Sequence, residues 1–132
     1  MDPNIRDLVR SRARNVCEYC HLPQRATPLI HFHVEHIVPR QHGGSDDPAD
    51  LALACDRCNA YKGPNLASID PETRAVVALF NPRKDIWSEH FATRAGHIVG
   101  VTAIGRATAR LLNMNAARRV ELRLECEELG KD

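Results

Sequence analysis

The sequence has few aromatic residues and almost no imbalance of charge. Aromatic side chains make up 5 % of the 132 residues, so we expect no open platform on which successive bases stack. The 18 basic and 17 acidic residues leave a net charge of +1, which excludes an acidic disordered chain and a strongly basic nucleic-acid tail. The hydrophobic fraction of 43 % is sufficient for the interior of one domain with an extension.

Long apolar runs are also missing. No stretch approaches the roughly 20 apolar residues that a membrane span requires. Residues 1–15, MDPNIRDLVRSRARN, are charged and lack the apolar segment of a secretory signal. From these absences we predict a cytoplasmic location.

Lysine is scarce, whereas arginine is abundant. Only three of the 18 basic residues are lysines. Residues 94–123 carry six arginines against one acidic residue, Glu121, which gives a local charge of +5. Arginine forms bidentate contacts with phosphate, so this segment predicts either phosphate binding or a solvated helical surface.

Four of the five cysteines form two Cys-x2-Cys pairs. Cys17 and Cys20 precede Cys55 and Cys58 with 34 residues between the pairs. This spacing indicates a tetrahedral zinc site with four thiolate ligands. Disulfides would require an oxidising compartment, and a redox protein typically has a single pair after a strand. We expect the fifth cysteine, Cys126, to be a small buried hydrophobic residue.

Periodicity and turn residues divide the chain into short elements. Residues 1–66 are predicted to form the zinc-clipped core, and residues 67–132 an extension packed on it as one unit. The core is predicted to contain a helix over 3–15, a strand over 30–38, a loop over 39–50, an apolar run over 51–54 and a helix over 59–62. The extension is predicted to contain a strand over 75–80, a hairpin of 90–93 with 97–102, and helices over 103–112 and 116–129. Thr102 and Asn115 are the expected caps of these two helices, and Trp87 with Phe91 the expected anchor on the core.

Chemically active side chains are concentrated between and beside the cysteine pairs. Glu35 supplies a carboxylate, which is a hard oxygen ligand for a divalent cation. His36 follows it directly, and an imidazole with an ordinary pKa near ~6.5 can deprotonate water. Asn59, directly after Cys58, supplies a second hard oxygen, and a zinc clip would bring it close to Glu35 and His36. We expect the nearby His33 to be packed or hydrogen-bonded.

These motifs together resemble the zinc-clipped type of HNH endonuclease. The resemblance covers about residues 8–64 and rests on the motifs Cys17-x2-Cys20, Glu35-His36-Ile37-Val38-Pro39-Arg40, Gly43-Gly44, Asp50-Leu51, Cys55-x2-Cys58-Asn59 and Lys62-Gly63. It implies an α+β fold with a ββα-metal core, in which a two-stranded hairpin and a helix surround one catalytic cation. The full prediction adds the four-cysteine zinc site and a C-terminal extension of short strands and two helices.

The resemblance also implies roles for individual residues. His36 matches the general base, while Glu35 and Asn59 match ligands of a catalytic cation, Mg²⁺ or Mn²⁺. The middle position of the motif, usually Asn, is Asp50 here, and an ionised Asp accepts hydrogen bonds but cannot donate one. Asp50 therefore either braces the loop through backbone N–H groups or weakens the geometry of the base.

The implied reaction is the hydrolysis of nucleic-acid phosphodiester bonds, with double-stranded DNA as the expected substrate and 5′-phosphate and 3′-hydroxyl ends as products. The residues expected to contact nucleic acid are Arg40, Lys62, Arg106 and Arg110. The alternative is a non-catalytic zinc module that binds nucleic acid or protein, and Asp50 is the residue that favours it. The oligomeric state stays open, with a homodimer through the C-terminal helices as one arrangement.

Overall fold

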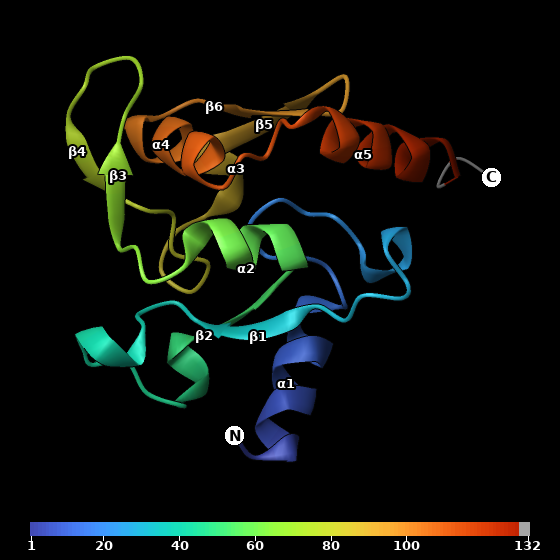
Figure 1. The fold of residues 1–132 in the computed structure, drawn as a ribbon, viewed down its shortest axis with the longest axis vertical. Coiled ribbons are helices and arrows are strands. Elements are labelled where there is room, and N and C mark those ends of the chain that lie inside the picture. The colour runs from blue at the N-terminus through green and yellow to red at the C-terminus, as the bar shows by residue number, and fades with distance from the viewer. Residues whose placement is uncertain (130–132) are drawn as a thin grey trace.

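A computed structural model describes residues 1–129 and shows three separate two-stranded antiparallel sheets with five α-helices (Figure 1). The first part of the chain contains α1 (Pro3–Ala13), β1 (His33–His36), β2 (Leu51–Ala54) and α2 (Asp56–Lys62). The second part contains β3 (Ala67–Ile69), β4 (Val76–Ala78), α3 (Trp87–His90), β5 (Phe91–Arg94), β6 (His97–Gly100), α4 (Ala103–Leu111) and α5 (Ala117–Leu129). Short 3₁₀ turns occupy Gln24–Ala26, Arg40–His42 and Pro48–Asp50.

Helix α1 begins with ordinary capping chemistry and contacts the β1–β2 hairpin through two arginines. The Asp2 carboxylate accepts a hydrogen bond from the Asn4 N–H at 2.8 Å, and Pro3 stands in the first turn. Two arginines of α1 then reach the hairpin: Arg10 donates to the Phe32 carbonyl at 2.9 Å, and Arg12 to the Leu51 carbonyl at 2.8 Å. The helix thus lies against one side of the β1–β2 hairpin (Figure 1).

The hairpin and α2 form the predicted ββα unit. Strands β1 and β2 pair from His33 with Ala54 to His36 with Leu51. All four residues of β2 are buried, because α1 covers the hairpin on one side and α2 lies on the other (Figure 1). Helix α2 begins at Asp56, three residues before the predicted start, because Cys55 acts as its cap and accepts from the Cys58 N–H.

The second part of the chain contains the predicted β5–β6 hairpin and α4. The Thr102 hydroxyl caps α4 by accepting from the Gly105 N–H at 3.0 Å, as predicted. Strand β4 lies inside the predicted 75–80 segment, and its partner β3 was not expected. The three residues of β3, Ala-Ser-Ile, are too few and too mixed to give a strand pattern.

Two expectations for the C-terminal helix, the Asn115 cap and the burial of Cys126, are wrong. Asn115 does not cap α5, because its side-chain amide pairs instead with the N–H and carbonyl of Ile98, both at 2.8 Å. The inner face of α5 buries Arg119 and Arg123, whereas Leu124 is 43 % exposed. Cys126, expected to be buried, is only partly so.

Contacts join the second part of the chain to the first. The Trp87 indole N–H donates to the Tyr19 carbonyl at 2.8 Å, and its ring stacks on His21 with centroids 3.9 Å apart. Phe91 packs beside Trp87, with ring centroids 5.0 Å apart, so this pair anchors the two parts as expected. The division at residue 66 stays a prediction, and residues 130–132 of the predicted extension lie outside the described residues. Within residues 1–129 no helix is long and apolar enough to cross a membrane.

Candidate metal centre and active site

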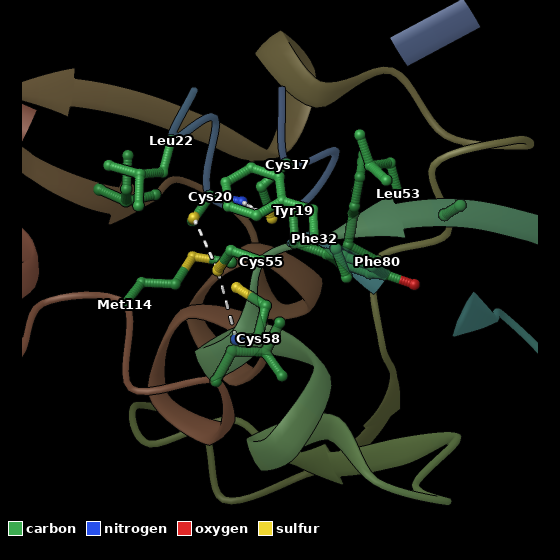
Figure 2. Packing of buried hydrophobic residues seen from close by; sticks show 14 of the residues in the cluster. Cys17, Tyr19, Cys20, Leu22, Phe32, Leu53, Cys55, Cys58, Phe80 and Met114 are labelled. Atoms are coloured by element: carbon green, nitrogen blue, oxygen red, sulfur yellow. Dashed lines mark hydrogen bonds between the residues drawn. The ribbon is translucent and has the colours of Figure 1, made fainter. Parts of the chain in front are cut away.

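The four paired cysteines converge on one buried point. Cys17 and Cys20 lie in the loop after α1, Cys55 lies between β2 and α2, and Cys58 lies in α2. Their sulfur atoms all lie within 4.8 Å of one another, and none forms a disulfide. The Sγ atoms of Cys20 and Cys55 are 3.7 Å apart, close to the edge of about 3.8 Å expected for a tetrahedron with Zn–S bonds of about 2.3 Å. Figure 2 shows the sulfurs gathered beside Met114, and the cluster fits a structural zinc ion.

A buried arginine of α5 contacts this cluster. One Arg119 N–H donates to Cys58 Sγ at 2.9 Å, and Cys55 Sγ lies 3.6 Å away. The same guanidinium donates to the carbonyls of Leu112 and Asn113, just after α4. Burial alone lowers the pKa of Arg119, but the charge of the neighbouring cysteine sulfurs outweighs it and raises the pKa above its ordinary value. Arg119 is therefore a fixed cation between the zinc cluster and α4.

His36 lies at the end of β1 and is hydrogen-bonded to a carboxylate of the following loop. Its Nε2 is 2.8 Å from Oδ1 of Asp46, and the same oxygen accepts from Arg40 at 2.6 Å. The hydrogen bond with His36, followed by that with Arg40, lowers the pKa of Asp46 below its ordinary value. The His36 side chain is 21 % exposed, so solvent reaches the ring.

Glu35 points to the opposite side of β1 and is buried. One of its carboxylate oxygens accepts from the Tyr19 hydroxyl, and the other forms an ion pair with Lys62 of α2 at 3.2 Å. Lys62 is also buried and donates to the Ile37 carbonyl at 2.9 Å. Burial raises the pKa of Glu35, and the nearby Lys62 charge and Tyr19 hydroxyl only partly offset this effect.

Asn59 lies on the stripe of α2 that faces β1. One turn before it, Asp56 approaches His33 of β1 at 3.3 Å, and one turn after it Lys62 contacts Glu35. Glu35 and Asn59 therefore belong to facing surfaces and supply the oxygen ligands that Mg²⁺ and Mn²⁺ prefer. The donor set suits a hard divalent cation, although the Lys62 ammonium already occupies one position beside Glu35.

Asp50 braces the loop that carries His36 and Asp46. Its Oδ1 accepts from the Val38 N–H at 2.9 Å, whereas its Oδ2 is buried without a hydrogen-bond partner. The loop folds back so tightly that a Cβ on Gly44 would lie 1.6 Å from the Val38 carbonyl oxygen and 2.7 Å from Asp50 Oδ2. This position therefore requires glycine, and the unpaired Oδ2 lies close to another acceptor.

The four residues predicted to contact nucleic acid have different surroundings. Arg40 is 65 % exposed beside Asp46, and Arg110 is exposed on α4. Lys62 is only 2 % exposed. Arg106 donates to both carboxylate oxygens of Asp70 at 3.0 and 2.9 Å and also contacts Glu72. Lys62 and Arg106 thus have structural partners, which leaves Arg40 and Arg110 accessible.

A family comparison matches this part of the chain. The family model described as HNH endonuclease matches residues 17–65, from the first zinc ligand to just beyond α2. These residues are similar to the HNH domain of that family. HNH proteins are usually nucleases, so the domain indicates a nuclease or nucleic-acid-related function. No curated protein and no solved structure matches the chain.

Sequence reasoning about the HNH domain missed three contacts. Asp46 was not singled out, because the segment Ser45-Asp46-Asp47-Pro48 offers two adjacent carboxylates and only the fold decides which one reaches His36. Nor does the sequence give any sign that Tyr19, between two zinc ligands, donates to Glu35. The sequence also does not distinguish Arg119, which contacts the zinc cluster, from the adjacent Arg118, which is exposed and pairs with Glu121.

Proposed function

We propose that this protein is a metal-dependent endonuclease that hydrolyses phosphodiester bonds of DNA, with His36 as the general base. The observation that carries the proposal is the position of His36 within the HNH domain. The ring stands at the loop end of the β1–β2 hairpin, partly exposed and hydrogen-bonded to a carboxylate. A histidine so held can take a proton from an attacking water molecule near neutral pH.

Each neighbouring residue has a distinct part in this reaction. Glu35 and Asn59 would hold the divalent cation, which supplies charge neutralisation at a non-bridging phosphate oxygen and at the leaving 3′ oxygen. The Lys62 ammonium pairs with the Glu35 carboxylate at 3.2 Å and holds it in place. Asp50 holds the backbone of Val38, two residues after His36, and so sets the path of the loop.

Two arginines, Arg40 and Arg110, would bind the phosphates of the polyanionic substrate. Arg40 follows the His36 motif directly, and most of its side chain is accessible. Arg110 lines a surface depression between α4 and the β5–β6 hairpin together with Arg94 and His97. Such contacts bind phosphate without reading the base sequence, and their contribution decreases as salt rises.

A second candidate is a zinc-containing module that binds nucleic acid without cleaving it. It is favoured by one specific observation, that Tyr19 and Lys62 engage both carboxylate oxygens of Glu35. A cation bound by Glu35 would compete with the Lys62 ammonium and the Tyr19 hydroxyl for the carboxylate oxygens. The module would retain the zinc cluster and the exposed arginines.

Plasmid cleavage separates the two candidates. Purified zinc-loaded protein is incubated with supercoiled plasmid in Mg²⁺, in Mn²⁺ and in EDTA, and DNA binding is measured in parallel. We expect nicked or linear product only with a divalent cation. Protein that keeps zinc and binds DNA but cleaves in neither metal would support the binding module.

A further inference from the structure

Asp46, which is not one of the motif residues, forms a carboxylate–imidazole pair with His36. The Asp46 carboxylate comes from the loop after β1, ten residues beyond the histidine. We propose that Asp46 is a positioning residue that fixes the ring of His36 for proton abstraction, with Arg40 holding Asp46 in turn. This inference rests on the proposed nuclease function.

The hydrogen bond determines which ring nitrogen carries the proton. A carboxylate can only accept, so the nitrogen that faces it at 2.8 Å, Nε2, must be the donor. Among residues 1–129, His36 has no other side-chain hydrogen bond. The neutral ring therefore keeps its lone pair on Nδ1, which makes Nδ1 the atom that accepts the proton from water. The carboxylate then stabilises the imidazolium that forms.

The loop holds Asp46 where this contact requires it. Gly43 has a φ of 92°, and Gly44 fits only because it lacks a side chain, so the chain turns back toward Val38. Asp47, the residue after Asp46, caps the 3₁₀ turn Pro48–Asp50 by accepting from the Ala49 N–H at 2.9 Å. Arg40 donates to the same Asp46 oxygen as His36 does, at 2.6 Å. The Asp46 carboxylate is thus oriented by two hydrogen bonds to its Oδ1, one from His36 and one from Arg40.

A proton spectrum of the histidine rings tests this pairing without any assay of activity. In ¹⁵N-labelled, zinc-loaded protein at a mildly alkaline pH, the His36 signals are identified by their loss in His36→Gln. We expect an Nε2-bound proton protected from exchange with water, and its loss to exchange in Asp46→Ala. Asp56→Asn is the matched control, because Asp56 faces His33 at 3.3 Å and its loss leaves the His36 signal unchanged.

Cleavage kinetics test the consequence for catalysis. Asp46→Ala is expected to lower kcat about 100-fold, the lower end of what a general base contributes. KM for DNA should be unchanged, because the proposal assigns Asp46 to the ring of His36 and not to the binding of DNA. Asp46→Glu should recover part of the rate. Both variants should retain zinc, since Asp46 lies outside the cysteine cluster.

The results that would overturn the inference are distinct from a failure of the proposed function. A proton on Nδ1 of His36 in the wild type, or an Nε2 proton that persists in Asp46→Ala, would refute the pairing. Unchanged kcat in Asp46→Ala would refute the positioning role. A wild-type protein that cleaves no DNA would refute the nuclease function, while the spectrum would still decide whether Asp46 fixes the ring.

Discussion

Among single residues, Asp50 has one satisfied carboxylate oxygen and one that is not. Its Oδ1 is bonded to the Val38 N–H, whereas its buried Oδ2 has no hydrogen-bond partner and lies, like the Val38 carbonyl oxygen, beside Gly44. A buried acceptor without a partner costs free energy of folding. The residue therefore braces the loop at a cost that an amide in the same place would avoid.

We predict that Asp50→Asn raises the free energy of unfolding by about 1 kcal/mol, because the amide nitrogen replaces Oδ2 and donates to the nearby carbonyl. Urea unfolding of the zinc-loaded protein, followed by Trp87 fluorescence, measures the change. Asp47→Asn is the control, since Asn and Asp are equivalent caps and its stability should stay within a few tenths of a kcal/mol. A less stable Asp50→Asn variant would show that the carboxylate has a role of its own.

The chemical role of a residue could be predicted from the sequence where the spacing of like residues alone defines that role. The four cysteines belong to this class, because two Cys-x2-Cys pairs have few other uses. The partners of Glu35 do not, since Tyr19 and Lys62 lie 16 and 27 positions away along the chain and meet it only through the fold. The role of each site residue in catalysis stays a prediction.

Among the helices, α5 is the one whose buried face the sequence describes least well. Val120, Leu122 and Leu124 are spaced by two residues, so they cannot share one face of a helix. The inward face instead carries Arg119 and Arg123, four residues apart, which bind backbone carbonyls before and after α4. The helix thus attaches to the zinc cluster and to α4 by hydrogen bonds more than by apolar packing.

We predict that Arg119→Met weakens zinc retention about 10-fold to 100-fold, the usual effect of removing a hydrogen bond to a metal ligand. Zinc transfer to a chromophoric chelator measures it. Arg118→Ala is the control on the same helix, because Arg118 is 65 % exposed and forms ion pairs with Glu121 and Glu125 on the surface. Equal zinc transfer from both variants would remove Arg119 from the account of the metal site.

An ion pair between Asp70 and Arg106 connects the β3–β4 hairpin to α4. Asp70 is fully buried, and the hydrogen bonds from Arg106, together with those from the backbone and Thr73, hold its pKa well below the ordinary value. A carboxyl whose pKa is lower in the folded state stabilises the fold above its unfolded pKa, near ~3.9. That stabilisation is lost as the pH falls through the folded pKa.

Asp70→Asn should therefore be less stable than the wild type at neutral pH, and the difference should shrink as the pH falls below about 4. Unfolding of both proteins across a pH series measures this difference, which is unaffected by any zinc loss common to both. Glu72→Gln is the control, since Glu72 is 69 % exposed and its pairing with Arg106 contributes little. A difference independent of pH would contradict the assigned ionic pair.

Across the chain as a whole, the local patterns predicted the ββα core, the β5–β6 hairpin and both C-terminal helices. The contacts that assemble these elements could not be predicted, because they join segments far apart in sequence. Arg119 reaches Cys58 across 61 positions, and Trp87 reaches Tyr19 across 68. These contacts hold the second part of the chain against the part that contains the zinc cluster.

The most direct test of the account compares DNA cleavage by the wild type and His36→Ala in Mg²⁺ and Mn²⁺, with zinc content and thermal unfolding measured on the same samples. We predict that cleavage falls to background in the variant while zinc content and unfolding temperature stay unchanged, because His36 is partly exposed and lies outside the zinc cluster. A variant that still cleaves, or one that loses zinc or its fold, would contradict the assignment of His36 as the general base.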